Sequence, residues 1–294
     1  MTYFITGANG FLGSYLIKNI LERTTDRIIA TDLKCPKDNS NGRIKWLPLD
    51  ITDEKQMKSV FKHTQTEQLK VLFLAAYLHP DLVEKNPKTA WKINIVALAK
   101  FFEIFDNIDS FYYPSTEVVY GQARKRPFKE KDVLKPVSLY GRQKSVAEKM
   151  VLSLNYNVVR FPVLIGPSLF KERKHFFDEI IEKVSAGQTV EMFYDQYRSF
   201  IDFNTAAKTL VDLVETPEAG RFHIVNIAGD EALSKYELGV RICKWHDLNS
   251  QYIIPINMTG DQKIFKFAKR SRKTLLDNSL VKKILNLKEL KLEV

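Results

Sequence analysis

Apolar residues in the first 162 positions follow two patterns that alternate along the chain. Short continuous apolar runs are typical of buried strands, and apolar residues that recur every three or four positions are typical of helices. The runs predict strands over residues 2–6, 27–31, 44–49, 71–76, 111–115 and 157–161, and the periodic stretches predict helices over residues 11–23, 53–63, 87–105 and 138–154. This alternation predicts an α/β fold, a doubly wound parallel sheet with helices on both faces.

The alternation weakens after Pro162. Short strand and helix signals are separated there by turn-forming stretches such as residues 216–220 and 227–233. We therefore expect two parts, residues 1–162 and a smaller α+β region of residues 163–294, interleaved with each other. Because open α/β sheets bind ligands at the carboxyl ends of their strands, we expect the second part to fold back over that edge.

Composition excludes several classes of protein. The longest apolar run, residues 71–78, is far too short to span a bilayer, and no N-terminal signal pattern is present. Two cysteines, Cys35 and Cys243, cannot build a disulfide framework, and no histidines lie at metal-ligand spacing, so we expect no metal and a cytoplasmic setting. The net charge of +10 favours anionic partners, but the lysines are scattered and form no basic stripe with interleaved aromatic residues. We therefore expect neither a nucleic-acid nor a membrane partner.

Three glycines, Gly7, Gly10 and Gly13, lie between the first predicted strand and the first predicted helix. In a Rossmann fold, glycines in this context allow a tight turn, close approach of the backbone to a pyrophosphate, and close packing of helix on strand. The pyrophosphate then rests on the N-terminus of the helix. Ordinary turns also collect glycine, so the spacing alone leaves both interpretations open.

Two aspartates follow later strands and support a dinucleotide site. Asp32 ends the second strand, where a carboxylate can accept hydrogen bonds from the adenosine ribose and repel a 2′-phosphate. This favours NAD, although nearby Lys34 leaves NADP possible. Asp50 ends the third strand and is placed to meet the adenine edge. The alternatives are a turn carboxylate for Asp32 and a helix cap for Asp50.

Candidate chemistry lies in two later segments. Tyr140 and Lys144 are four residues apart on a predicted helix and therefore share one face. A neighbouring ammonium lowers the pKa of a phenol, so we expect Tyr140 to act as a general acid or base near neutral pH. Thr116 follows the fifth strand, where its hydroxyl would bind the same substrate oxygen.

These motifs together resemble the extended short-chain dehydrogenases/reductases, in particular the NAD-dependent epimerase/dehydratase group that acts on nucleotide sugars. The similarity covers nearly the whole chain. The matching segments are residues 7–13, Asp32, residues 49–53 and 74–77, Asn94, and residues 115–121, 140–144, 160–167, 198–210 and 270–285.

The resemblance implies a function for each matched position. Thr116 steadies the substrate oxygen, Tyr140 exchanges the proton, and Lys144 lowers the pKa of Tyr140 and holds the nicotinamide ribose. The implied cofactor-binding residues are Gly7, Asn9, Gly10, Phe11, Leu12, Gly13, Asp32, Leu33, Asp50, Ile51, Leu74, Ala75, Ala76, Asn94, Pro114, Ser115, Tyr140, Lys144 and Phe161.

Departures from the family pattern narrow the reaction. Dehydratases carry two consecutive carboxylates after the threonine, whereas this chain has Glu117 followed by Val118, which argues against dehydration. The pattern over residues 75–95 resembles the 4-ketoreductases of deoxysugar synthesis, of which dTDP-4-dehydrorhamnose reductase is the nearest type. We therefore expect reduction of a C4 keto group. The alternatives are a 4-epimerase with tightly bound NAD, and a noncatalytic dinucleotide- or RNA-binding protein on the same fold.

The resemblance also implies substrate contacts and an assembly. The implied substrate-binding residues are Tyr77, His79, Glu117, Val118, Arg198 and Arg270. The two arginines would clamp a nucleotide diphosphate, since guanidinium matches phosphate geometry, but they are equally consistent with ordinary surface arginines. A homodimer is expected, packed through the helices over residues 87–105 and 138–154.

Overall fold

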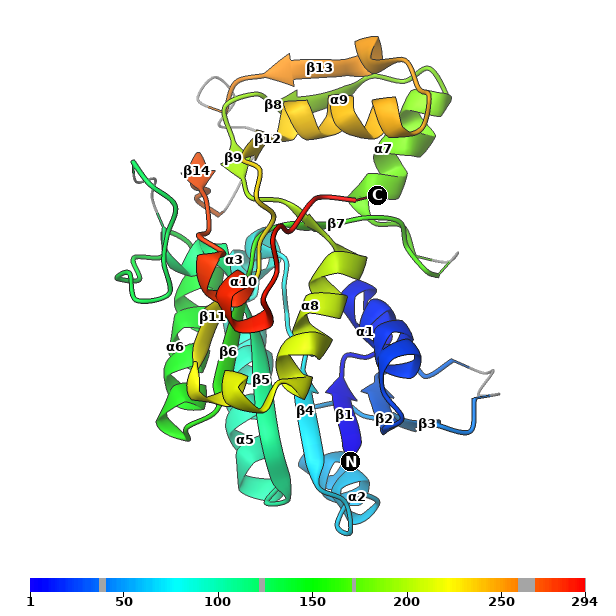
Figure 1. Ribbon diagram of the computed structural model, residues 1–294, viewed down its shortest axis with the longest axis vertical. Helices are drawn as coiled ribbons and strands as arrows, with labels where there is room; N and C mark the ends of the chain where they lie inside the picture. Colours follow the sequence, from blue (N-terminus) through cyan, green and yellow to red (C-terminus); the bar gives the residue numbers. More distant parts are fainter. Residues whose placement is uncertain (37–40, 122–124, 171–172, 259–267, 294) are drawn as a thin grey trace.

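A seven-stranded parallel sheet forms the centre of the computed structural model, which describes residues 1–36, 41–121, 125–170, 173–258 and 268–293 (Figure 1). Its strand order is β11-β6-β5-β4-β1-β2-β3. The strands are β1 (Thr2–Thr6), β2 (Arg27–Asp32), β3 (Ile44–Pro48), β4 (Leu69–Phe73), β5 (Ile108–Thr116), β6 (Asn157–Phe161) and β11 (Ile224–Asn226). The order reverses between β1 and β4, so the predicted doubly wound sheet is confirmed, with its topological switch point at these two strands.

Helices cover both faces of this sheet. On one face α1 (Phe11–Arg23), α8 (Phe203–Glu215) and α10 (Ser279–Leu285) pack in a core that includes Leu16, Ile20 and Leu210. On the other face α2 (Glu54–Lys62), α5 (Ala97–Ile104) and α6 (Leu139–Ser153) enclose a second core that includes Phe4 and Phe101. The central strands are therefore buried on both sides, which explains their continuous apolar runs.

The helix predicted over residues 87–105 is present over residues 87–104, with one π-helical turn inside it. It consists of α4 (Pro87–Trp91), a π-helical turn (Lys92–Val96) and α5, and a further short helix, α3 (Pro80–Lys85), precedes it. The π turn carries buried Asn94, whose Oδ1 accepts a hydrogen bond from the Tyr77 backbone N–H at 2.8 Å and whose Nδ2 donates to Gln143 Oε1 at 2.9 Å. Asn94 therefore ties the loop after β4 to α6, and π turns of this kind are frequent at functional sites.

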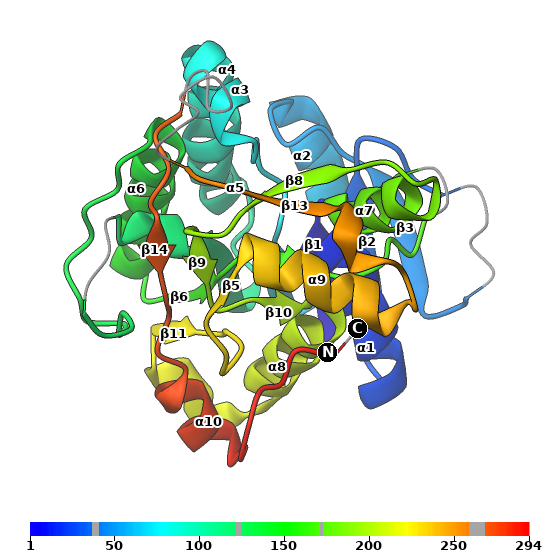
Figure 2. The ribbon, with the colours of Figure 1, turned by 90° about the horizontal axis from the view of Figure 1, so that it is seen from above.

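Most residues after 162 form a second layer above the sheet, which we call the upper lobe. Others rejoin the central layers: β11 is the edge strand of the large sheet, and α8 and α10 pack on its face. Figure 2 shows α9 (Lys235–Trp245), β8 (Val190–Phe193) and β13 (Ile253–Ile256) lying across the carboxyl ends of the sheet strands. The lobe also holds α7 (Phe176–Ser185) and the short strands β7 (Leu164–Ile165), β9 (Tyr197–Arg198), β10 (Ile201–Asp202), β12 (Leu233–Ser234) and β14 (Lys273–Thr274). In the described part of the chain, three short 3-10 helices span Glu117–Val119, Pro217–Arg221 and Ser250–Tyr252. Within the described residues, no helix has both the length and the apolar character needed to cross a membrane.

Candidate active site

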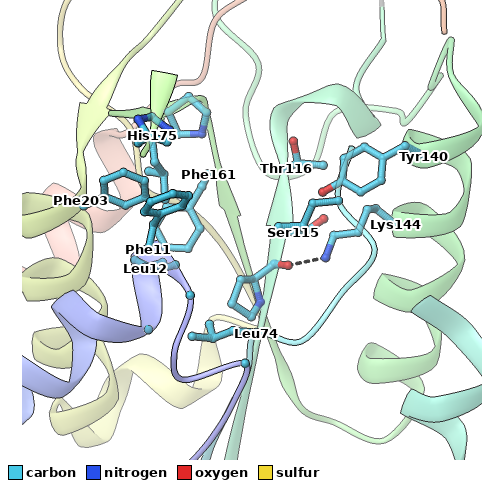
Figure 3. A pocket seen from close by; sticks show the side chains of 17 residues that line it. Phe11, Leu12, Leu74, Ser115, Thr116, Tyr140, Lys144, Phe161, His175 and Phe203 are labelled. Atoms are coloured by element: carbon cyan, nitrogen blue, oxygen red, sulfur yellow. Dashed lines mark hydrogen bonds between the residues drawn. The ribbon is translucent and has the colours of Figure 1, made fainter. Parts of the chain in front are cut away.

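A groove runs along the carboxyl ends of β1, β2, β4 and β5, beneath the upper lobe. It consists of two adjoining pockets, of about 330 Å³ and about 450 Å³. Gly7, Gly10, Phe11, Leu74 and Leu78 line both pockets and therefore mark where they join. We call the smaller one, which reaches Thr116 and Tyr140, the inner pocket (Figure 3), and the one that reaches Asp32 the outer pocket. This is the edge at which open α/β sheets bind ligands.

The glycine-rich turn forms the floor where the two pockets meet. Gly7 has a φ of +67°, and a Cβ on it would lie 2.9 Å from the Ala75 backbone nitrogen. A Cβ on Gly13 would lie 2.4 Å from the carbonyl oxygen of Ala8, which explains why helix and strand can pack so closely here. Gly10 caps α1 without a side-chain hydrogen bond, and the first turn holds no acidic residue. The first-turn N–H groups therefore remain available, and this cradle fits the pyrophosphate of a dinucleotide.

Asp32 and Asp50 both line the outer pocket. Asp32 Oδ2 accepts a hydrogen bond from the Asn9 backbone N–H at 3.0 Å, and its Oδ1 accepts one from the Leu33 backbone N–H at 2.8 Å. Asp50 Oδ1 accepts hydrogen bonds from the Thr52 backbone N–H and hydroxyl, both at 2.8 Å. The cap of α2 is Asp53, so Asp50 does not cap this helix, and its carboxylate instead holds the turn that precedes the helix at the edge of the pocket.

Thr116, Tyr140 and Lys144 lie together on one wall of the inner pocket. Figure 3 shows them facing Phe11, Phe161, His175 and Phe203 on the opposite wall. Thr116 ends β5, while Tyr140 and Lys144 lie one turn apart on α6. Lys144 Nζ donates a hydrogen bond to the Pro114 carbonyl oxygen at 2.6 Å. The predicted catalytic set is thus assembled at one place, from a strand end and a helix face.

The pKa values of Tyr140 and Lys144 differ from our expectation. We expected Lys144 to lower the pKa of Tyr140, but burial and the nearby Glu117 carboxylate raise that pKa instead. Burial also lowers the pKa of Lys144 to about 7. The Lys144 ammonium is held by the Pro114 carbonyl and lies 4.0 Å from the ring centroid of Tyr113. In the absence of a ligand, Tyr140 is therefore a protonated phenol at neutral pH.

Two of the residues expected to bind substrate pair with each other. Arg198 Nε lies 3.0 Å from Glu117 Oε1, and Arg198 Nη2 donates to the Ser271 carbonyl oxygen at 2.9 Å. Both partners are buried, and burial raises the pKa of Glu117 and lowers that of Arg198. Neither residue lines the groove, so this pair joins the end of β5 to β9 of the upper lobe. Arg270 pairs with Asp81 at 3.0 Å.

The remaining predicted residues fall into two groups. Tyr77 lines the outer pocket, whereas His79 is exposed at the N-terminus of α3 and Val118 packs beside Tyr140. Asn9 contributes backbone contacts, and buried Asn94 lines neither pocket but accepts a hydrogen bond from the backbone of Tyr77, which lines the outer one. The predicted cofactor-binding residues that line one of the pockets are Gly7, Gly10, Phe11, Leu12, Gly13, Asp32, Leu33, Asp50, Ile51, Leu74, Ala75, Ala76, Pro114, Ser115, Tyr140, Lys144 and Phe161.

Arg173, His175 and Phe203 also line the groove, and sequence reasoning missed all three. The His175 ring packs edge-on against Phe11 and Phe203, with centroids 5.1 and 5.0 Å apart. Burial lowers the pKa of His175 to about 4, so the imidazole is neutral at physiological pH. The capping box of His175 and Asp178 at the start of α7 could have placed a helix here, but nothing local indicated contact with α1.

A third pocket, of about 350 Å³, lies in the upper lobe. Its walls include the apolar side chains of Val163, Phe176, Ile180, Met192 and Phe193, together with Lys235, the first residue of α9. Burial and the charges of Arg198 and Arg270 lower the pKa of Lys235 to about 8. Among the described residues, the ammonium of Lys235 has no hydrogen-bond or ion-pair partner. The described residues also hold no cluster of three or more histidine, cysteine or acidic side chains placed to bind a metal ion.

The whole chain matches one family of proteins. The family model described as RmlD substrate binding domain matches residues 1–293, and the chain belongs to this family. This agrees with the resemblance to enzymes that act on nucleotide sugars.

Individual relatives share little sequence identity with this chain, but the similarity extends over most of its length. The chain is 25% identical over 254 residues to the probable low-salt glycan biosynthesis reductase Agl14 of Haloferax volcanii, covering 83% of this chain and 80% of the relative. It is 26% identical over 258 residues to methionine adenosyltransferase 2 subunit beta of Xenopus laevis, covering 86% and 74%. Its fold is similar to that of dTDP-4-dehydrorhamnose reductase of Bacillus anthracis in complex with NADP, with a TM-score of 0.76, 19% identity and coverage of 99% and 94%.

Proposed function

We propose that this protein is an NAD(P)-dependent reductase of the C4 keto group of a nucleotide-activated hexose or deoxyhexose. The observation that supports it most directly is the position of Thr116, Tyr140 and Lys144 on one wall of the inner pocket, which opens onto the glycine cradle and Asp32. A hydroxyl, a phenol and an ammonium at the end of a dinucleotide groove are the groups that carbonyl reduction requires.

The groove residues suggest how a dinucleotide would be held. The N-terminus of α1 would bind the pyrophosphate, Asp32 the adenosine ribose, and Lys144 the ribose next to the nicotinamide. The bound cofactor, when reduced, supplies the hydride. Asp32 favours NAD(H), because its carboxylate repels a 2′-phosphate.

Tyr140 is suited to be the proton donor. Its raised pKa keeps the phenol protonated, and the phenol faces the same pocket as the Thr116 hydroxyl. As hydride adds to the carbonyl carbon and the C=O double bond becomes a single bond, the proton of Tyr140 passes to the carbonyl oxygen. The product is an alcohol, and Thr116 would orient the oxygen by a hydrogen bond.

The upper lobe supports an anionic substrate. Lys235 is a partly buried cation with Arg198 and Arg270 nearby, and the pocket that it lines combines apolar side chains with a second lysine, Lys183, and two carboxylates, Glu179 and Glu191. Burying a cation without a partner is costly, and an anionic ligand relieves that cost. We infer that the diphosphate of a nucleotide sugar binds near Lys235, while Val118 leaves no second carboxylate for dehydration.

Two alternatives make different predictions. A 4-epimerase would retain NAD and turn over without added cofactor, whereas a reductase would consume one reduced dinucleotide per product. Similarity to methionine adenosyltransferase 2 subunit beta favours a second class, a subunit that binds another protein. Such a protein would still have the groove, but it would catalyse no reaction that uses Tyr140 as a proton donor.

The test is an assay with a panel of 4-keto nucleotide sugars and either NADH or NADPH. The rate is measured as the fall in absorbance of the reduced nicotinamide. Tyr140→Phe should lower the rate by about 10²- to 10⁴-fold, because only the proton donor is lost. Binding of the dinucleotide should stay nearly unchanged, which serves as the internal control. Turnover of Tyr140→Phe within about twofold of the wild-type rate would contradict the proposed acid role.

A further inference from the structure

Two described parts of the upper lobe, at Pro167 and over residues 173–175, lie against the glycine-rich turn and the start of α1. The Tyr15 hydroxyl donates a hydrogen bond to the Pro167 carbonyl oxygen at 2.8 Å, and His175 packs on Phe11. Between these two anchors, Arg173 Nη1 donates a hydrogen bond to the carbonyl oxygen of Asn9. The upper lobe therefore contributes an arginine to the cradle formed by the glycine-rich turn.

Arg173 is the one cation among the described residues that line the outer pocket. The carboxylates of Asp32 and Asp50 line the same pocket and make it unfavourable for further negative charge. A pyrophosphate adds two negative charges, and the partial charge at the N-terminus of α1 offsets only part of them. An additional counter-ion is therefore needed close to this turn.

The present contact of Arg173 does not use its charge. Its partner is a neutral carbonyl, its side chain is exposed, and it forms no ion pair with the described acidic residues. Because Tyr15 and His175 already attach these parts to α1, the Asn9 contact is not needed to hold them there. A guanidinium free to exchange a carbonyl for two phosphate oxygens gains both charge and bidentate geometry.

We propose that Arg173 is a positioning residue for the cofactor, which binds the pyrophosphate of the dinucleotide together with the α1 N-terminus. This inference rests on the proposed function, since it assumes that the groove holds a dinucleotide. It assigns the upper lobe a part in cofactor binding as well as in substrate binding.

The experiment measures the dissociation constants of NADH and NADPH by titration of the full chain, without substrate. Arg173→Ala should weaken both dinucleotides by a similar factor, about tenfold, because both contain the pyrophosphate. Arg173→Lys should retain part of the affinity as a point charge. Lys174→Ala is the matched control: its ammonium pairs with Glu182, so its removal should leave binding unchanged.

Salt provides a second measurement. The wild-type dissociation constant should rise more steeply with salt than that of Arg173→Ala, because one charge contact is screened. Equal affinities and equal salt slopes would overturn the inference, and so would a loss confined to NADPH, which would place Arg173 at the 2′-phosphate. Failure of the wild-type chain to bind either dinucleotide would instead refute the proposed function.

Discussion

Lys144→Met should stabilise the ligand-free protein while it removes activity. Lys144 is 3% exposed, and burial lowers its pKa from 10.5 to about 7. Each pH unit between these values costs about 1.4 kcal/mol, so folding with a neutralised Lys144 costs about 4 to 5 kcal/mol at pH 7. Methionine has a similar length and no charge, so it avoids that cost, although it loses the hydrogen bond to Pro114.

The pH dependence of the free energy of unfolding separates the desolvation of Lys144 from other effects of the substitution. Between pH 7 and 10.5 the unfolded chain keeps a proton on Lys144 that the folded chain has released, so the free energy of unfolding of the wild type rises with pH. The free energy of unfolding of Lys144→Met lacks this rise, because methionine does not titrate. Its advantage over the wild type should therefore shrink by about 1.4 kcal/mol per pH unit through this window and stay constant below it.

The assay is urea unfolding of both proteins at several pH values, with Lys149→Met as the control. Lys149 lies exposed on the same helix. Its removal should change the free energy of unfolding little, and equally at each pH. A difference between wild type and Lys144→Met that is flat from pH 7 to about pH 9.5 would refute the argument that Lys144 is desolvated.

Three further predictions concern the groove and the assembly. Thr116→Ala should lower the rate less than Tyr140→Phe, and Thr116→Ser should retain much of the activity; an equal loss in both variants would show that the hydroxyl is not what matters. Asp32→Ala should weaken NADH and narrow the preference over NADPH in binding titrations, and a wild-type preference for NADPH would contradict the reasoning. The chain should sediment as a homodimer at micromolar concentration, and a monomer there would exclude it; exposed Trp91, Val96 and Val146 on helices α4 to α6 offer apolar contacts.

The residues of the site that could be predicted are those set by local geometry. Gly7 directly follows β1, and Asp32 and Thr116 end β2 and β5, so an alternating α/β pattern alone brings them to one edge of the sheet. Tyr140 and Lys144 needed only helical spacing. Arg173 was missed because its place against α1 depends on how the upper lobe folds back, which no periodicity records.

Electrostatics was the less predictable part. The spacing of Tyr140 and Lys144 indicated a lowered phenol pKa, but that argument assumed a hydrated, charged lysine. Burial of both groups and the carboxylate of Glu117 reverse the direction. We expected the homodimer to pack through the helix over residues 87–105, but Phe101 and Phe105 of this stretch are buried in the core of the same chain. Their burial therefore gives no support to the dimer.

The return of the chain to the large sheet has a consequence for synthesis on the ribosome. β11 pairs with β6, and α8 packs against α1, yet both come from residues after 200. The edge of β6 and the apolar face of α1 therefore stay uncovered until translation has passed Asn226. A nascent chain that carries only the first 162 residues presents an open strand edge and bare apolar surface, the features that chaperones recognise and that favour aggregation. Folding of this protein should thus be largely completed after, rather than during, synthesis of its first half.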